Sequence, residues 1–316
     1  MKRIHVIAPS GASLDESSPA AGIDWLNSQG ITVKNTECLK RVHQRFSGTD
    51  TQRLAELNAI AQLPPEDFVM AMRGGYGLHR LLPDVEWDAI ARAVEQGLQI
   101  CGHSDFTAFH LGLLAKTGAI SLSGPMLNYD FGHQAMEGEA SNPNRNEFMW
   151  KHFINAARER TLACSVSSPQ SYLGEKTSGE ISGILWGGNL TVLTSMIGTP
   201  FFPNHEQTQG GILFLEDVNE HPYRIERMLI QLTDSGVLAN QAAILLGGFS
   251  AYRLFESDRG YDLKSAIKAI RARLSGNIPL LTDLPFGHQA NKITLPVGAQ
   301  AGLTYDKAGF QLKASW

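Results

Sequence analysis

Short apolar segments alternate with amphipathic helical segments along the first part of this chain, and this alternation restricts its fold more than any other feature. One helix signal lies near residues 50–62, where Leu54, Leu57 and Ile60 recur at helical spacing. Strand–helix alternation predicts a parallel sheet with helices on both faces. The expected strands are residues 4–8, 31–35, 68–72, 98–101 and 119–122, and the expected helices lie near 18–29, 50–62, 86–96 and 106–117.

The pattern weakens after about residue 133, and a second set of elements follows. Residues 133–180 are polar and turn-rich, with one expected helix near 147–158. We therefore predict an N-terminal domain of residues 1–140, a linker region of residues 141–180 and a C-terminal domain of residues 181–316. The elements expected in the second domain are strands at 183–186, 212–216 and 243–246, helices near 189–197, 222–233 and 262–274, and a strand-rich end at 292–313.

Composition excludes several classes of partner. The chain has a formal net charge of -4, which provides no basic surface for nucleic acid or an anionic membrane. No apolar run approaches the ~20 residues of a membrane span, and the first one is too short for a signal peptide. The cysteines are odd in number and far apart, which favours neither a disulfide framework nor a cysteine metal site. We expect a reduced, cytoplasmic protein without nucleic-acid or membrane partners.

A serine stands where an expected buried strand meets an expected helix, in the segment LQICGHSDFTAFH at residues 98–110. Ser104 can be the N-cap of that helix, because a serine hydroxyl accepts a hydrogen bond from a free N–H of the first turn. It can also be a nucleophile on a strand–helix turn, beside N–H groups that stabilise an oxyanion. The preceding His103 is expected to point elsewhere, because side chains alternate along an extended segment.

Two acidic residues end the expected strand at 212–216. Alternation places Glu216 and Asp217 on opposite faces, and an acid at the end of an apolar strand lies at the mouth of the sheet. The alternative is that Glu216, Asp217 or Asn219 helps to start the helix that opens at Pro222.

A histidine and a glycine-rich segment complete the candidates. His288 lies in a glycine-flanked loop, where catalytic side chains are often found, although an exposed loop histidine without a role is the alternative. The segment RGGYG at 73–77 follows an expected strand and can present bare N–H groups at close range or form a plain turn. It has the spacing of neither a dinucleotide fingerprint nor a P-loop.

Together these segments supply a serine, a carboxylate, a histidine and a glycine loop. Acyl transfer requires four such parts, namely a nucleophile, a base, a group that orients the base, and oxyanion donors. The sequence contains no HExxH motif and no close cluster of histidine and acidic residues. We therefore expect no metal and no cofactor.

The combination resembles the serine LD-carboxypeptidases. The resemblance runs from residue 4 to about residue 305, in order and without large gaps. It implies an α/β fold with a three-layer N-terminal domain similar to the class I glutamine amidotransferases. A smaller C-terminal domain of swivelling β/β/α, barrel-like form follows, with the active site between the two. The segments that carry the resemblance are VIAPSG, RFSGTDTQRLAELN, AMRGGYGLHRLL, CGHSDFTAFHLGLL, SGPM, LWGGNLTVLTSMIGTP, LEDVNEHPYRIERML and FGHQANKITLPVGA.

The resemblance also implies a Ser–Glu–His triad. Motif by motif, the nucleophile is Ser104 in GHSD, the carboxylate is Glu216 in LED and the base is His288 in FGH. Phe106 stands where a G-x-S-x-G elbow has its last glycine, which argues against a hydrolase-fold lipase or esterase.

Other residues are expected around the cleft. The backbone N–H groups of Asp105 and Gly75 are the expected oxyanion donors. Arg73 is a candidate for binding an anionic substrate, with a role in holding its loop as the alternative. Further candidates for substrate binding are Gly74, Trp186 and Asn189, with core packing as the alternative for Trp186.

The substrate implied by the resemblance is the murein tetrapeptide L-Ala–γ-D-Glu–diaminopimelate–D-Ala, which loses its terminal D-alanine during cytoplasmic murein recycling. The resemblance also implies a homodimer. One alternative is a peptidase of the same family that cleaves peptide-antibiotic or acyl-nucleotide substrates for self-immunity. Others are an amidotransferase-like module that uses Cys101 and a non-catalytic binding protein. The amidotransferase requires a cysteine at the elbow, where this chain has a serine.

Overall fold

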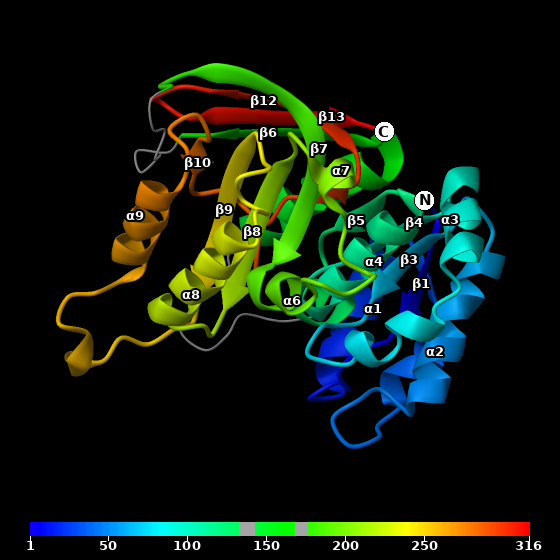
Figure 1. The fold of residues 1–316 in the computed structure, drawn as a ribbon. Helices are drawn as coiled ribbons and strands as arrows, with labels where there is room; N and C mark the ends of the chain where they lie inside the picture. The colour runs from blue at the N-terminus through cyan, green and yellow to red at the C-terminus, as the bar shows by residue number, and fades with distance from the viewer. Residues whose placement is uncertain (133–142, 168–175) are drawn as a thin grey trace.

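The computed structural model describes residues 1–132, 143–167 and 176–316, with side chains of residues 143–146 excepted. Within these residues the chain forms two sheets, one of six strands and one of seven, with helices packed against both (Figure 1). None of the helices described is both long enough and apolar enough to cross a membrane.

The first sheet has the strand order β11-β5-β4-β3-β1-β2. Every neighbouring pair is parallel except β11–β5, so the predicted parallel sheet is confirmed. The strands are β1 (Arg3–Ile7), β2 (Thr32–Lys34), β3 (Phe68–Ala71), β4 (Gln99–Gly102), β5 (Ser121–Ser123) and β11 (Leu295–Val297).

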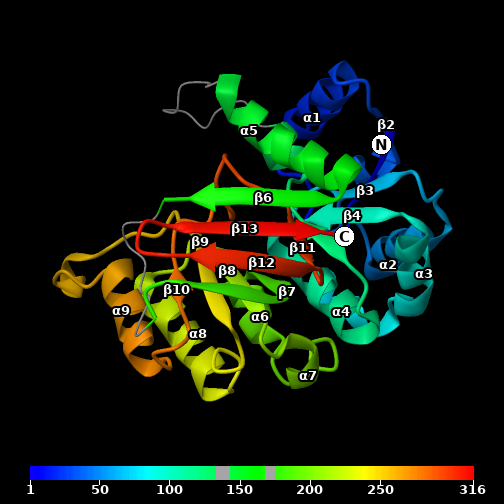
Figure 2. The same ribbon diagram turned by 90° about the horizontal axis from the view of Figure 1, so that it is seen from above.

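Helices cover both faces of this sheet, as the alternation predicts (Figure 2). One face packs on α1 (Ser17–Ser28), α5 (Pro143–Ile154) and the short π-helical segment η6 (Leu127–Phe131), around a cluster that includes Leu26 and Phe153. The other packs on α2 (Asp50–Ala59), α3 (Trp87–Gln96) and α4 (Thr107–Thr117), through residues such as Leu57 and Ile90. The arrangement is the expected three-layer α/β domain.

The second sheet has the order β10-β9-β8-β7-β12-β13-β6 and is curled, so that β12, β13 and β6 cross above β8 and β9 in Figure 1. Its first four strands are parallel and its last three are joined antiparallel. The strands are β6 (Thr161–Val166), β7 (Gly179–Asn189), β8 (Ile212–Val218), β9 (Ala243–Ser250), β10 (Leu280–Leu281), β12 (Gln300–Tyr305) and β13 (Phe310–Ser315). The helices beside it are α6 (Leu190–Ser195), α7 (His205–Thr208), α8 (Pro222–Asp234) and α9 (Leu263–Arg273).

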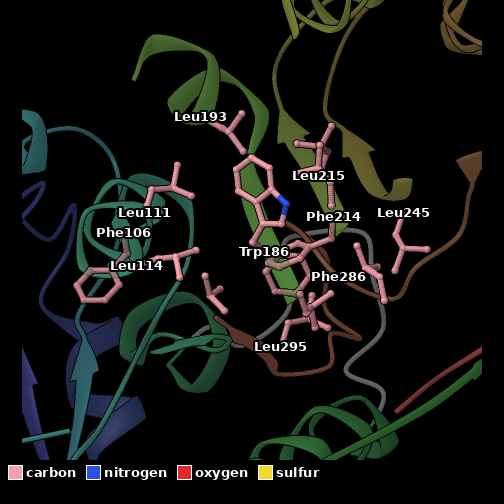
Figure 3. Close-up of a cluster of buried hydrophobic side chains, with 14 of the residues drawn as sticks. Phe106, Leu111, Leu114, Trp186, Leu193, Phe214, Leu215, Leu245, Phe286 and Leu295 are labelled. Carbon is pink, nitrogen blue, oxygen red and sulfur yellow. The ribbon is translucent and has the colours of Figure 1, made fainter. Parts of the chain in front are cut away.

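A single apolar cluster joins the two halves. Figure 3 shows Leu111 and Leu114 of α4 on the side toward Trp186 and Leu193, and Phe106 of η5 belongs to the same cluster. All of these side chains are buried. The halves are therefore packed through α4, the helix that follows the candidate nucleophile.

Two strands depart from the sequence expectations. β6 lies inside the expected linker of residues 141–180, where no strand was predicted, and it forms the edge of the second sheet. β11, from the strand-rich end, pairs with β5 of the first sheet instead of the second. Residues 141–142 and 168–175 of the expected linker lie outside the described residues. The domain boundaries themselves stay a prediction.

Candidate active site

Ser104 opens the short 3-10 helix η5 (Ser104–Phe106), which connects β4 to α4. Its φ angle is 62°, in the left-handed region that residues with side chains seldom adopt. A strained turn of this kind at the carboxyl end of a parallel strand is typical of a nucleophile that is held out from the backbone. The N-cap positions of η5 and α4 are His103 and Phe106, so Ser104 caps neither helix.

The glycine segment at 73–77 lies directly against this serine. A Cβ atom at Gly74 would be 2.7 Å from both Cβ and Oγ of Ser104 and 3.2 Å from the Asp105 nitrogen. Only glycine permits this approach without a shift of one segment. The expected oxyanion donors, Asp105 and Gly75, thus belong to two adjacent stretches of backbone.

The serine, histidine and glutamate form one chain of hydrogen bonds. His288 Nε2 lies 3.0 Å from Ser104 Oγ, and His288 Nδ1 lies 2.7 Å from Glu216 Oε2. Glu216 is fully buried, whereas the His288 side chain is 22% exposed. Because a carboxylate only accepts hydrogen bonds, Nδ1 carries the proton of the neutral ring, and Nε2 is left to accept the proton of the serine.

The loop that carries His288 passes closely over the carboxylate. Gly287 has a φ of 126°, which strains any other residue, and a Cβ atom there would lie 3.1 Å from Glu216 Oε2 and force its neighbours to shift. Burial lowers the pKa of His288, but the charge of Glu216 and its hydrogen bond outweigh burial and hold the pKa above its usual value of 6.5. An imidazole whose pKa lies near or somewhat above neutral pH is suited to act as a general base.

Glu216 is itself held by a neighbouring strand. Asn189, beside it at the end of β7, donates from Nδ2 to Glu216 Oε1 and to Asp217 Oδ1, both at 3.1 Å. Asp217 also accepts hydrogen bonds from the backbone and hydroxyl of Thr191, at 2.9 and 2.7 Å. The pairing of β8 with β9 shifts register between Leu215 and Asp217. Glu216 therefore contacts His288, while Asp217 contacts the start of α6.

Neither acid starts the following helix. The N-cap of α8 is His221, whose ring accepts a hydrogen bond from the Tyr223 N–H at 3.3 Å. Glu216 and Asp217 are both residues of β8. The helix-start alternative for this pair is thus not what the chain adopts.

Two of the expected substrate-binding side chains make internal contacts. Trp186 has no exposed surface and donates from Nε1 to Gln241 Oε1 at 2.8 Å, which favours core packing over a place in the cleft. Asn189 is likewise buried, and its side-chain amide donates hydrogen bonds to Glu216 and Asp217. Arg73 also makes internal contacts. Its Cζ atom lies 5.4 Å from the centroid of the Tyr129 ring, and its Nη1 atom donates to Ala12 O at 2.8 Å. The Arg73 Nε atom has no hydrogen-bond partner among the described residues.

Sequence reasoning gave no role to His103 and did not identify Asp130 and Lys292, although the side chains of all three are buried behind His288. The available signal was the single lysine in the otherwise uncharged segment KITLPV. Among the described residues, no group of three or more histidine, cysteine or acidic side chains is arranged to hold a metal ion. The absence of a cofactor stays a prediction.

Comparison with known families gives matches in both halves of the chain. Residues 4–124 match the LD-carboxypeptidase N-terminal domain, and residues 182–303 match the LD-carboxypeptidase C-terminal domain. The first range includes Ser104, and the second includes Glu216 and His288.

Individual proteins are similar over nearly their whole length. The murein tetrapeptide carboxypeptidase of Pseudomonas aeruginosa is 29% identical over 302 residues, which cover 95% of this chain and 92% of that protein. The crystal structure of muramoyltetrapeptide carboxypeptidase from Oxalobacter formigenes superposes with a TM-score of 0.83 at 38% identity, covering 99% of each chain. The microcin C7 self-immunity protein MccF of Escherichia coli is 26% identical over 316 residues, which cover 92% of this chain and 86% of that protein.

Proposed function

Because the chain belongs to the LD-carboxypeptidase family, we propose that it is a serine peptidase that releases terminal D-alanine from murein tetrapeptides. The observation that carries this proposal is the hydrogen-bonded chain from Ser104 through His288 to the buried Glu216. It contains a nucleophile, a base and an orienting carboxylate in the order that acyl transfer uses. The named relatives that act on murein tetrapeptides supply the substrate class.

In the first half of the proposed reaction, Ser104 Oγ attacks the carbonyl of the diaminopimelate residue while His288 Nε2 takes the hydroxyl proton. The imidazolium that forms is stabilised by Glu216 through Nδ1–H. His288 then gives the proton to the nitrogen of the departing D-alanine as the peptide bond breaks. The product of this half is an ester between the tripeptide and Ser104.

In the second half, a water molecule attacks the ester carbonyl and gives one proton to His288. The ester bond breaks, and the imidazolium returns that proton to Ser104 Oγ. Both halves pass through a tetrahedral oxyanion, for which we propose the N–H groups of Asp105 and Gly75 as donors, with Gly74 providing the space beside the nucleophile.

The substrate is anionic, so a cation near the reacting carbonyl aids its binding. Arg73 is the first residue of the glycine segment that lies against Ser104, and we propose its guanidinium as the contact for a substrate carboxylate. Its hydrogen bond to Ala12 leaves the loop-holding role as the alternative. Trp186 and Asn189 are omitted from the proposed substrate contacts because their side chains are engaged internally. We further propose that the protein acts as a homodimer in the cytoplasm, where it takes part in murein recycling.

Mass spectrometry of a purified murein tetrapeptide incubated with the protein tests this function. We expect the loss of one alanine from the tetrapeptide, and no loss with the Ser104→Ala variant as the matched control. The second candidate function is a peptidase that cleaves acyl-nucleotide substrates for self-immunity, which the likeness to MccF favours. A parallel incubation with an aminoacyl sulfamoyl nucleoside tests it. Cleavage of the nucleoside conjugate without release of D-alanine from the tetrapeptide contradicts the proposed substrate and leaves the serine mechanism standing.

A further inference from the structure

Behind His288 lie three buried polar side chains that the proposed reaction does not use. We call His103, Asp130 and Lys292 the rear cluster. His103 lies in the turn between β4 and η5, Asp130 lies in η6, and Lys292 lies in the loop before β11. His103 and Lys292 are each 2% exposed, and the Asp130 side chain is 5% exposed. Lys292 Nζ lies 2.5 Å from Asp130 Oδ1 and 3.4 Å from His103 Nε2.

The partners of His103 fix both the charge and the tautomer of its ring. Its Nδ1 atom lies 3.0 Å from the backbone oxygen of Gly124, which only accepts, so Nδ1 carries a proton. Its Nε2 atom faces the ammonium group of Lys292, which only donates, so Nε2 has a free lone pair. A proton on Nε2 would point directly at the cation. His103 is therefore neutral and protonated on Nδ1.

The anchored ring packs against the candidate base. The ring centroids of His103 and His288 are 5.1 Å apart with an interplanar angle of 68°, an edge-to-face contact. His288 is bound at its two nitrogens by Glu216 and Ser104, and the His103 ring borders it on a third side. Rotation of the His288 ring away from the serine must overcome this contact as well as the hydrogen bond to Glu216.

We propose that the rear cluster positions the general base: Lys292 keeps His103 neutral in one tautomer, and the anchored His103 ring keeps His288 aligned between Ser104 and Glu216. This deepens the proposed function and rests on it only in taking His288 as the base. His103 and Lys292 are positioning residues, because they act on the reacting atoms through His288. Asp130 balances the buried charge of Lys292, which without a partner would be costly.

The charges around the two rings explain why neutrality matters. A charged His103 would stand next to the imidazolium that His288 becomes during the reaction and would oppose its formation. Burial, together with the charges of Lys292 and His288, holds the pKa of His103 well below its usual value. Five polar or charged groups face His288, which are Ser104, His103, Glu216 of β8, Asp130 of η6 and Lys292.

Four titratable groups face His103, which are Lys292, Asp130, His288 and His110 of α4.

Nitrogen-15 NMR of the histidine rings in the intact protein tests the state of His103 without requiring any substrate. Signals are assigned with His103→Gln and His288→Gln variants. In the wild type we expect His103 to stay neutral and protonated on Nδ1 from pH 5 to 8. In Lys292→Met, Asp130 loses its cation and lies 3.8 Å from His103 Nδ1, so His103 is expected to gain a proton within that range. A wild-type His103 that is charged, or protonated only on Nε2, overturns the proposal.

Kinetics on the tetrapeptide test the consequence for catalysis. The double variant Lys292→Met/Asp130→Asn leaves no unpaired buried charge, so it serves if the single variant does not fold. In both variants we expect kcat to fall about 10-fold to 100-fold, as for small misplacements of reacting groups, with KM changed less than about twofold. Arg3→Met is the matched control, because it removes a cation from the buried Asp67, which lies just before β3 at the strand ends away from Ser104, and it should leave kcat unchanged.

The failure of the proposal and the failure of the proposed function give different results. A wild-type protein that releases no D-alanine contradicts the function, and the rate of Ser104 modification by a fluorophosphonate then replaces kcat as the readout. An unchanged kcat, or an unchanged modification rate, in a folded variant whose His103 signal has changed overturns the positioning role.

Discussion

At the scale of single residues, the strained backbone of Ser104 separates a functional serine from a structural one. Its φ of 62° disfavours any residue with a Cβ atom, and its hydroxyl caps neither η5 nor α4. A serine that only served packing could be replaced by glycine, which adopts this conformation freely. The strained backbone of Ser104 is explained because the turn brings its hydroxyl within 3.0 Å of His288 Nε2.

Two substitutions at Ser104 test this interpretation. Ser104→Ala and Ser104→Gly are both expected to lower kcat by about 10³-fold or more, because the nucleophile is lost. Ser104→Gly should be more stable than Ser104→Ala by about 0.5–1 kcal/mol, since glycine relieves the left-handed strain at some entropic cost. Urea denaturation measures the free energy of unfolding. Near-normal turnover in either variant would remove Ser104 as the nucleophile.

The two adjacent acids form a matched pair for a second prediction. Glu216→Gln should lower kcat by orders of magnitude, by analogy with the ~10⁴-fold loss for a triad Asp→Asn change in another protease. Asp217→Asn should cost less, because Asp217 contacts Asn189 and Thr191 instead of His288. Steady-state kinetics on the tetrapeptide decide between them, and a larger loss in Asp217→Asn would contradict the assignment of Glu216.

The raised pKa of His288 predicts the acidic limb of the pH–rate profile. The base must be neutral, so kcat/KM falls as the pH drops through this pKa, and the midpoint of the fall should lie above 6.5. In Glu216→Gln the raising effect of the charge is gone while burial still lowers the pKa. The midpoint should therefore move to lower pH even as the maximal rate falls. A midpoint that does not respond to this substitution would show that another group controls the limb.

At the scale of elements, local patterns predicted those parts of the fold that depend on local sequence. The expected helices near 50–62 and 86–96 appear as α2 and α3, since their apolar spacing and start signals lie within a few residues of one another. β6 was missed because it is an edge strand, whose sequence TLACSV lies in a polar region and is defined by pairing with β13, far along the chain. The crossing of β11 into the first sheet is likewise a long-range pairing without a local signal.

The same distinction applies to the site. Ser104 follows a predicted strand, Glu216 ends another, and His288 lies in a predicted glycine-flanked loop, so their residue types and positions were visible in the sequence. The register shift in β8 and the bridging amide of Asn189 depend on how β7, β8 and β9 pair, which spacing does not encode. His103 was expected to point away from Ser104, yet its ring lies against His288, because the loop carrying His288 arrives from 184 residues away.

Asp105 joins the elements that surround the nucleophile. Its buried carboxylate accepts hydrogen bonds from Ser10 Oγ at 2.7 Å and from the Leu78 N–H at 3.1 Å, so it connects η5 to the segments after β1 and β3. Asp105→Ala leaves both donors buried without an acceptor. We expect a loss of about 1–3 kcal/mol in the free energy of unfolding together with a reduced kcat.

The matched control for this prediction is Asp24→Ala, which removes an exposed carboxylate from α1. Denaturant titration should show little change for Asp24→Ala. Equal stability of the two variants would mean that the hydrogen bonds from Ser10 and Leu78 to Asp105 do not stabilise the fold.

At the scale of the whole molecule, the candidate site exists only where the two sheets meet. Ser104 follows β4 of the first sheet, whereas Glu216 belongs to β8 of the second and His288 to the loop between β10 and β11. The continuous apolar core through α4 fixes the halves against each other, and Thr107 Oγ1 at the start of α4 accepts a hydrogen bond from the Asn189 N–H at 3.0 Å. The geometry around Ser104 and His288 is thus a property of the assembled chain.

A site built between two packed halves should discriminate the chirality of its substrate. In the proposed function, the site has to hold the carboxylate and methyl group of D-alanine while Ser104 attacks the carbonyl of the preceding L-centre. In a peptide ending in L-alanine the methyl group and hydrogen exchange places, so either the methyl group clashes with the pocket or the carboxylate loses its contact. A 1 Å misplacement of the reacting carbonyl already costs about 10²-fold. We therefore expect kcat/KM to be at least about 10²-fold higher for the D-alanine peptide than for its L-alanine diastereomer. Equal values would contradict the LD-carboxypeptidase substrate while leaving the serine, histidine and glutamate as a general acyl-transfer site.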